Sequence, residues 1–219
     1  MQKKEGKYVK RLKTLLWLAV LILLFSACGT ERTKAPDNQT PQVTGIEERN
    51  DESSRDINET AREAINALKD KDMEKTAKLV HPGKGVRFSP YAFVDVKNDL
   101  VFSANDVKDL LSDTTIYTWG SYDGTGDPIE LTFEDYYKKF IYDVDFANAE
   151  KVGYNEILGK GNTIENSAEV YKDSVVVEYH FSGIDPQYDG MDWRSLRIVF
   201  EKFNDAWYIV GIIHDQWTI

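Results

Sequence analysis

The last third of the chain alternates between apolar and polar residues as β-strands do, and this limits the folds open to it. In the segment 175–181, VVVEYHF, every second residue is apolar, and the segment 196–201 repeats the pattern. After the turn signal Asn204-Asp205, the segment 207–213 reads WYIVGII and is apolar on both faces. Such a strand is too apolar for a sheet edge, so we predict that it lies in the middle of a sheet.

Helical patterns precede these strands. Apolar residues recur with helical spacing over 59–80, and an HPG sequence ends the pattern. Ser103 begins a short helix with a capping-box pattern, and Thr132 caps a further helix whose aromatic stripe runs through 133–141. Because the helices come mostly first and the long strands last, we predict an α+β fold in which helices pack on a curved, mostly antiparallel sheet.

This layout resembles the NTF2-like (cystatin-like) superfamily. The resemblance is carried by the helix pair at 59–80, the helix at 132–141 and the terminal hairpin, whose last strand reads AWYIVGI. It implies a single α+β domain over 59–219. The segments HPGKGVRFSPY, DYYKKF, MDWRSL and VGIIHDQW are also similar to an uncharacterised group of bacterial secreted proteins and lipoproteins. Neither resemblance implies an activity, because NTF2-like domains range from isomerases to structural modules.

The N-terminus has the pattern of an exported protein. A basic leader is followed by the apolar run 15–25, LLWLAVLILLF, which is too short to span a bilayer. The next residues, Ser26-Ala27-Cys28, resemble the lipobox of bacterial lipoproteins, although Phe25 stands where Leu is usual. The resemblance implies a signal peptide over 1–27 and lipidation of Cys28, and hence an extracytoplasmic protein anchored to the bacterial cell membrane. The alternative is an uncleaved signal anchor.

The segment 28–58 is polar and has no apolar period, so we predict a disordered tether there. Residues 1–27 hold six basic residues and one acidic residue, so their removal changes the formal net charge from −10 to −15. An acidic excess of this size argues against nucleic acid as a partner, because phosphates are bound by Lys and Arg. The expected partners are therefore the membrane, through the lipid, and an unknown envelope protein or small ligand.

Catalytic patterns are weak. A Ser-His-Asp set could be drawn around Ser89, but Pro90 follows it directly and has no N–H for an oxyanion hole. The three histidines are too scattered for a zinc motif, and the acidic turn at 123–127 lacks calcium-loop spacing, so we expect no metal and no cofactor. The stronger enzyme hypothesis is a carboxylate such as Asp192 or Asp215 with a tyrosine such as Tyr91 in an apolar pocket.

Two polar clusters flank large aromatic residues near the ends of strands, namely DWR at 192–194 and HDQW at 214–217. They could line a pocket mouth near the rim of the sheet's concave face. We favour a structural interpretation, in which Arg194 pairs with Asp215 and Trp217 is buried. The ligand-binding candidates are Tyr91, Trp119, Asp192, Arg194, His214, Asp215 and Trp217.

The function that this sequence favours is a non-catalytic binding or interaction module of the bacterial cell envelope. A small-molecule hydrolase or isomerase that uses a pocket carboxylate is the alternative, and a structural accessory to an envelope complex is a third possibility. An enclosed cavity with an acid inside would favour a ligand or an enzyme, whereas a filled core would favour an interaction surface.

Overall fold

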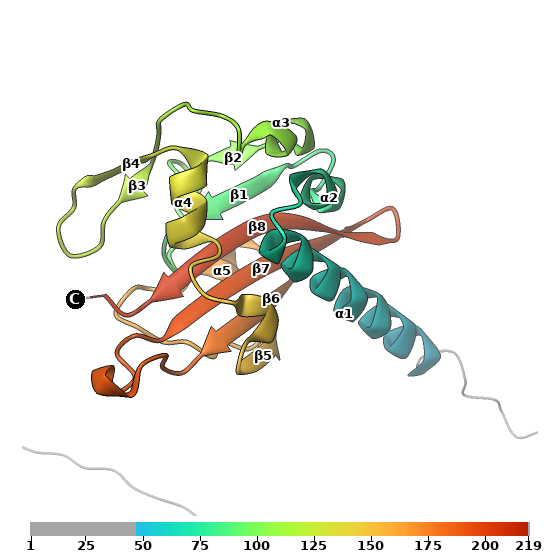
Figure 1. Ribbon diagram of the computed structural model, residues 1–219. Coiled ribbons are helices and arrows are strands. Elements are labelled where there is room, and N and C mark those ends of the chain that lie inside the picture. Colours follow the sequence, from blue (N-terminus) through green and yellow to red (C-terminus); the bar gives the residue numbers. More distant parts are fainter. Residues whose placement is uncertain (1–46, 219) are drawn as a thin grey trace, which may run out of the picture. The chain divides into compact units, whose positions relative to one another are not determined.

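A six-stranded sheet is the framework of the computed structural model, which describes residues 47–218 (Figure 1). In spatial order its strands are β2 (Val101–Phe102), β1 (Val86–Ser89), β8 (Ala206–Gln216), β7 (Arg194–Phe203), β6 (Ser174–Phe181) and β5 (Lys151–Tyr154). Only the β1–β8 pair is parallel. The predicted α+β class with a curved, mostly antiparallel sheet is confirmed at this level.

Strand β8 lies between β1 and β7, which confirms the prediction that the apolar segment 207–213 is central. Asn204 and Asp205 have φ angles of 48° and 63°, which are the left-handed values of a tight hairpin turn. The β7–β8 register shifts between Val199 and Phe200. Such a bulge bends the two strands and contributes to the curvature of the sheet.

Helices and one hairpin complete the fold. They are α1 (Glu47–Lys69), α2 (Met73–Leu79), α3 (Ala104–Asp109), α4 (Phe133–Phe140), α5 (Ser167–Val170), the short 3-10 helices η1 (Phe146–Asn148) and η2 (Pro186–Tyr188), and the hairpin β3 (Tyr117–Ser121) and β4 (Pro128–Leu131). Both predicted caps are present, because Ser103 and Asp106 form a capping box and the Thr132 side chain accepts from the N–H of Asp135.

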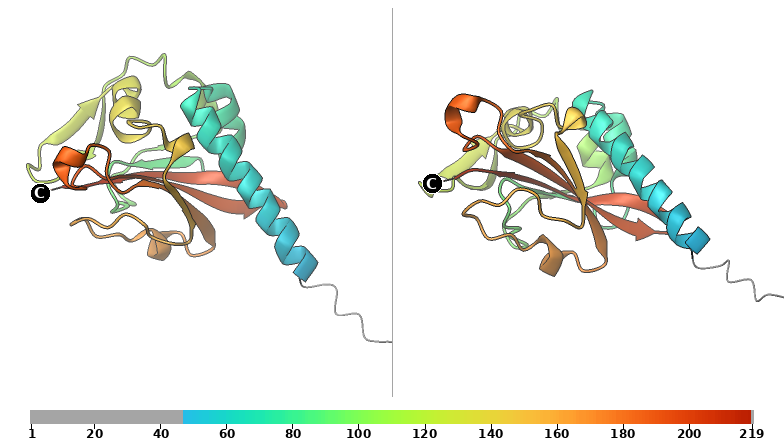
Figure 2. Two further views of the ribbon diagram at one scale, coloured as in Figure 1. Left: turned by 60° about the horizontal axis from the view of Figure 1, so that its bottom comes forward. Right: turned by 90° about the horizontal axis from the view of Figure 1, so that it is seen from below.

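The sheet is covered on both faces. Apolar residues of α1, α2 and α4 form one core with Phe88, Ile198 and Ile212 of the sheet. A second, smaller cluster includes Val199 and Val210 on the other face, where the chain around α5 packs. Figure 2 shows α5 on the opposite side of the sheet from α1 and α2. The sheet is covered on both faces because both faces of β8 are apolar and must be shielded from water.

Helix α1 begins before residue 59, where the sequence predicts the start of the domain. Helix α1 already includes 47–58, which we had assigned to the tether, and the side chain of Ile57 is only 6% exposed within the main core. This stretch has no repeated apolar pattern, but extending a helix from a packed segment costs little compared with starting one. The predicted signal peptide 1–27, Cys28 and the tether residues before Glu47 lie outside the described residues.

Replacing Ile57 should measure the contribution of the first turns of α1. We expect Ile57→Ala to lower the free energy of unfolding by about 2–4 kcal/mol, because it removes buried methyl groups from a core that cannot fully close around the gap. The control is Ile164→Ala, because Ile164 is 72% exposed and its loss should cost less than about 0.5 kcal/mol. Urea denaturation measures the free energy of unfolding of both variants. Equal values for the two would show that Ile57 does not contribute to the core.

Candidate functional site

The residues that the sequence singled out do not form one site. His214 and Arg194 meet on the helix side of the sheet, whereas Asp215 lies on the other side. In the β7–β8 register Asp215 is opposite Ser195, and neighbouring residues of a strand point to opposite faces. Arg194 and Asp215 therefore cannot pair, and the predicted ion pair between them is wrong.

Arg194 instead contacts Asp143 on the helix side of the sheet. The Nε of Arg194 donates to Asp143 Oδ2 at 2.8 Å, and Nε2 of His214 lies 3.2 Å from Asp143 Oδ1. The Phe140 ring meets the His214 ring edge-on at 5.8 Å between centroids. Burial alone would raise the pKa of Asp143, but His214 and Arg194 outweigh it and hold the pKa below its usual value. The cluster ties the segment after α4 to the sheet.

Asp215 belongs to a buried charge network on the opposite face. Arg197 donates to Glu178 Oε2 and to Asp215 Oδ2, both at 3.0 Å, and to the carbonyl oxygen of Gly159 at 2.9 Å. Glu178 also accepts from the backbone N–H of Gly159 and from the Ser195 hydroxyl. Burial raises the pKa of Asp215 to about 6 against the opposing charge of Arg197. The network holds the chain around Gly159 against the sheet.

Gly159 is required for this attachment. A Cβ added there would collide with the Ser195 hydroxyl and lie 2.6 Å from the Trp193 ring. His214 and Asp215 are the third-last and second-last residues of β8, as predicted, but both side chains are buried rather than exposed at a rim.

The other candidates have separate positions. Trp119 is buried, stacks on Tyr136 at 3.9 Å between ring centroids and donates its indole N–H to the carbonyl of Leu131, so it belongs to the core. The Asp192 carboxylate accepts backbone N–H groups of its own loop. Trp217 is 43% exposed, so the expectation that it is buried is wrong.

Tyr91 lines an open pocket of about 660 Å³ beside the β3–β4 hairpin, together with Asp95, Asp99 and Asp123. Asp99 is part of a short network in which its Oδ2 accepts from the Ser89 hydroxyl at 2.5 Å and from the backbone N–H of Asp95 at 2.9 Å. Burial raises the pKa of Asp99 to about 6, despite these hydrogen bonds. The pocket therefore pairs a perturbed carboxyl group with a tyrosine.

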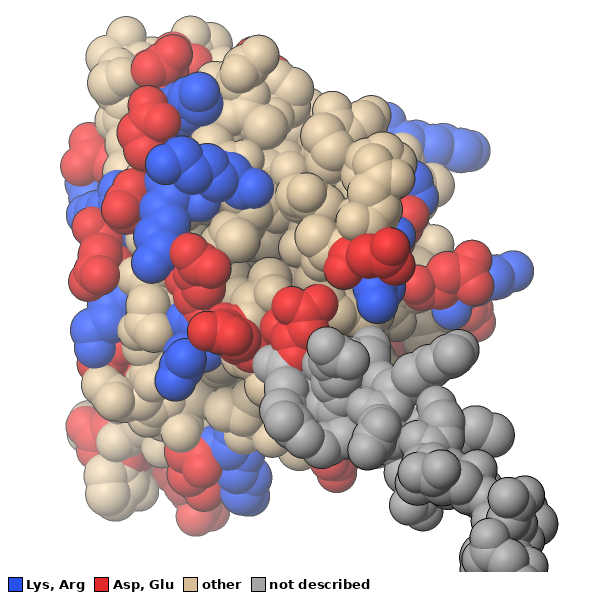
Figure 3. All heavy atoms as spheres, turned by 90° about the vertical axis from the view of Figure 1, so that its right-hand side faces the viewer, with Lys and Arg blue, Asp and Glu red and all other residues tan. Residues whose placement is uncertain are grey.

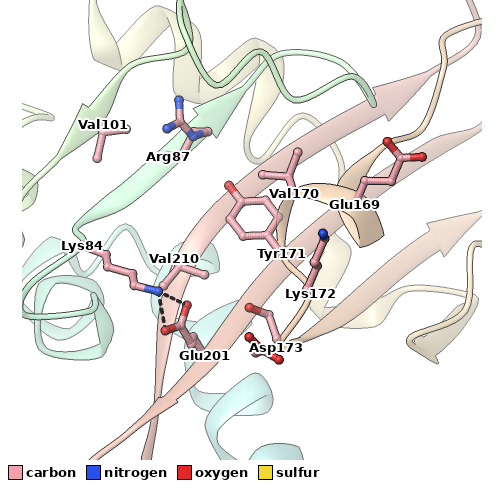
Figure 4. A pocket seen from close by; sticks show the side chains of 11 residues that line it. Lys84, Arg87, Val101, Glu169, Val170, Tyr171, Lys172, Asp173, Glu201 and Val210 are labelled. Carbon is pink, nitrogen blue, oxygen red and sulfur yellow. Dashed lines mark hydrogen bonds and ion pairs between the residues drawn. The ribbon is translucent and has the colours of Figure 1, made fainter.

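A second concavity lies on the face opposite the long helices, between β1, β8 and the chain at α5 (Figure 4). We call it the α5 cleft. Its volume is about 550 Å³, and its lining includes Lys84, Arg87, Tyr171, Lys172, Glu201 and Val210. Asn166 lies just before α5 and positions the cleft. Its side-chain amide accepts from the backbone N–H of Val94 and donates to the Val94 carbonyl.

Two polar groups in the α5 cleft are incompletely paired. Arg87 uses Nη1 to donate to the backbone carbonyls of Asp99 at 3.0 Å and Asp95 at 3.5 Å. The Tyr171 hydroxyl is buried and has no hydrogen-bond partner among the described residues. Burial raises the pKa of Tyr171 to about 12, although the positive charge of Arg87 and the approach of its N–H groups to the hydroxyl oxygen act against this rise. By contrast, Lys84 is paired with both carboxylate oxygens of Glu201, at 2.5 and 2.7 Å.

The sequence analysis did not identify Arg87 or Tyr171. A signal existed for Arg87, since it is a lone charge between Val86 and Phe88 in a short strand and so points away from the core that they enter. No local pattern marks Tyr171. It reaches the cleft because the chain from Gly159 to α5 crosses the second face of the sheet, and this depends on contacts distant in sequence.

Further observations on residues 47–218 concern metals and membranes. No group of three His, Cys, Asp or Glu side chains is arranged to hold a metal ion in this part of the chain. None of its helices has the length and apolar character needed to cross a bilayer.

Comparisons with known proteins give structural likeness only. No family model matches the chain, and no curated protein matches it. Solved structures that resemble it include a DUF4783 family protein from Bacteroides ovatus, with 10% identity, 72% of this chain and 94% of that chain covered, and a TM-score of 0.33. A Streptomyces avermitilis protein of the NTF2-like family, provisionally described as a dehydratase, has 11% identity, coverage of 77% and 99%, and a TM-score of 0.30.

A third structure comes from Xanthomonas campestris and is provisionally described as a calcium/calmodulin dependent protein kinase II association domain. It has 13% identity, coverage of 84% of this chain and 97% of that chain, and a TM-score of 0.30. At these TM-scores the likenesses transfer neither a site nor a function to this chain.

The buried charge network gives a test of its structural role. We expect Arg197→Met to lower the free energy of unfolding by about 3–5 kcal/mol, because Glu178 and Asp215 would remain buried without their counter-charge. Arg62→Met is the matched control, since Arg62 pairs with Glu59 at 3.9 Å on the exposed surface and its loss should cost less than about 1 kcal/mol. Urea denaturation measures the free energy of unfolding of both variants. A loss of stability for Arg197→Met as small as that of the control would contradict the structural role of the buried charge network.

Proposed function

We propose that this chain is a lipid-anchored extracytoplasmic protein whose NTF2-like domain binds a ligand or a partner without catalysing a reaction. The anchor rests on the sequence, in which a short apolar run ends at Ser26-Ala27-Cys28. Two acyl chains on Cys28 would hold the protein stably on a membrane, whereas one chain would not. The NTF2-like assignment rests on the order of helices and strands.

The observation that carries the binding role is the difference between the two faces of the sheet. On the helix side the interior is filled by large aromatic side chains, among them Phe133, Tyr136 and Phe140, all buried. On the other face the α5 cleft is open and contains donors with unused hydrogen-bonding capacity, on Arg87 and Tyr171. An open cleft with few convergent polar groups suits reversible binding.

Surface charge supports a partner other than nucleic acid. The whole chain has a formal charge of −10, and Figure 3 shows acidic and basic side chains interspersed on the face that it presents. Phosphate backbones are bound by clustered Lys and Arg, which release counterions. An envelope protein or a small molecule is a better match for a surface of mixed charge.

Cell fractionation tests the anchor. We expect the full-length protein in the membrane fraction and Cys28→Ala to remain uncut before residue 28, because the thiol is the group that receives the lipid. The control is a Ser26→Ala variant, which keeps a small residue in the lipobox and should be processed normally. A soluble wild-type protein, or normal cleavage of Cys28→Ala, would refute the lipoprotein proposal.

A hydrolase or isomerase is the second candidate, and one observation favours it. Asp99 has a pKa raised to about 6 and shares an open pocket with Tyr91. A carboxyl group with a pKa near the working pH is suited to move protons, and a tyrosine can donate a hydrogen bond to a developing oxyanion. The pair combines the predicted Tyr91 with a carboxylate that the sequence analysis did not name.

Asp99→Asn tests the state of this carboxyl group. Because its pKa is higher in the folded protein than the ordinary 3.8, the protonated form favours folding below pH 3.8, and this advantage is lost as pH rises through about 6. We therefore expect the melting temperature of the wild type to fall relative to Asp99→Asn between about pH 4 and 6, the range that these two pKa values span. Asp205→Asn lies in an exposed turn and is the control. Its melting temperature should change with pH in the same way as that of the wild type.

Turnover of p-nitrophenyl esters by the same proteins tests the catalytic role. Activity in the wild type that Asp99→Asn loses and Asp205→Asn keeps would favour the enzyme over the binding module. Parallel melting curves for Asp99→Asn and the wild type would instead show that Asp99 has an ordinary pKa.

A further inference from the structure

We infer that the α5 cleft binds a small monocarboxylate, held between the Arg87 guanidinium and the Tyr171 hydroxyl. The inference rests on the proposed binding role and names the ligand class. Figure 4 shows the Tyr171 hydroxyl directed toward the Arg87 side of the cleft, with Lys84 turned away to Glu201.

Arg87 supplies the charge. Its guanidinium carries donors on three nitrogens, of which Nη1 donates to two backbone carbonyls, and the Tyr171 hydroxyl lies close to the same guanidinium. No side-chain carboxylate in the described part of the chain forms an ion pair with it. A guanidinium that keeps an unused edge is suited to a carboxylate, whose two oxygens match its fork of N–H groups.

Tyr171 supplies a second donor. A buried hydroxyl without a partner is unfavourable, because it has lost water and gained no hydrogen bond. It lies against the backbone of β8, where a Cβ added to Gly211 would come within 2.8 Å of the hydroxyl oxygen. Gly211 therefore allows this close approach, and an anion in contact with both groups would accept hydrogen bonds from the Tyr171 O–H and the free N–H groups of the Arg87 guanidinium.

The other lining residues select the kind of anion. Glu169, Asp173 and Glu201 balance the charges of Lys84, Arg87 and Lys172, so the cleft as a whole is close to neutral. A dianion such as phosphate would meet twice the repulsion from these three carboxylates that a single negative charge at Arg87 meets. Val101, Val170 and Val210 give the same cleft an apolar side, which suits a carboxylate with a short apolar body.

Benzoate is a suitable probe, because it joins one carboxylate to a compact apolar ring. Isothermal titration of the full-length protein in detergent should show saturable binding of benzoate and weaker binding of inorganic phosphate. We expect Tyr171→Phe to weaken benzoate binding about tenfold or more, since it removes one hydrogen bond to a charged group. Its melting temperature should be unchanged or higher, because the lost hydroxyl has no partner in the free protein.

Two further variants complete the test. Arg87→Lys keeps the positive charge but removes the two parallel N–H donors of the guanidinium. It should weaken benzoate binding about as much as Tyr171→Phe does. Tyr154→Phe is the control, because Tyr154 is 41% exposed on β5 and its loss should leave the affinity unchanged. If Arg87→Lys fails to fold, Tyr171→Phe alone carries the test.

The outcomes separate this inference from the proposed function. No saturable binding of benzoate, or tighter binding of phosphate, overturns the monocarboxylate assignment. Benzoate binding that Tyr171→Phe and Arg87→Lys both retain places the ligand elsewhere and overturns the assignment to the α5 cleft, while a binding role for the domain stands. Failure of the anchor proposal is detected independently by fractionation of the Cys28→Ala variant.

Discussion

The fold depends on the burial of β8 from both sides. Its apolar residues enter the main core on one face and the smaller cluster on the other, so the strand is stable only where the sheet continues on both edges and layers cover both faces. β1 and β7 supply the edges. The helices supply one layer, and the chain from 155 to 173 supplies the other. The proposed ligand cleft lies in this second layer.

Charged residues fasten each layer to the sheet. On the helix side, Asp143 joins the segment after α4 to Arg194 and His214. On the other side, Arg197 and Glu178 hold the backbone at Gly159. A buried charge is costly unless paired, so these contacts specify how each layer sits more than they add stability. The hydrogen bonds of Asn166 with Val94 then place α5, and with it Tyr171.

The two faces differ in what they can do. Aromatic side chains fill the core on the helix side, whereas the α5 cleft is open on the opposite face. Asp99 and Arg87 are close neighbours, because Arg87 donates to the Asp99 backbone carbonyl, yet they line different pockets, one acidic and one of balanced charge.

Local patterns in the sequence determined the fold class, the central position of β8, the Asn204-Asp205 turn and the helix caps, because alternation, turn preference and capping act between residues close in the chain. The start of α1 and the burial of Ile57 depended on packing and were missed. Only the tertiary structure decided which charges meet, because Arg194 and Asp215 are separated by a one-residue difference in register that sends them to opposite faces. The α5 cleft has the same origin: Arg87 and Tyr171 come together through long-range contacts that no local pattern encodes.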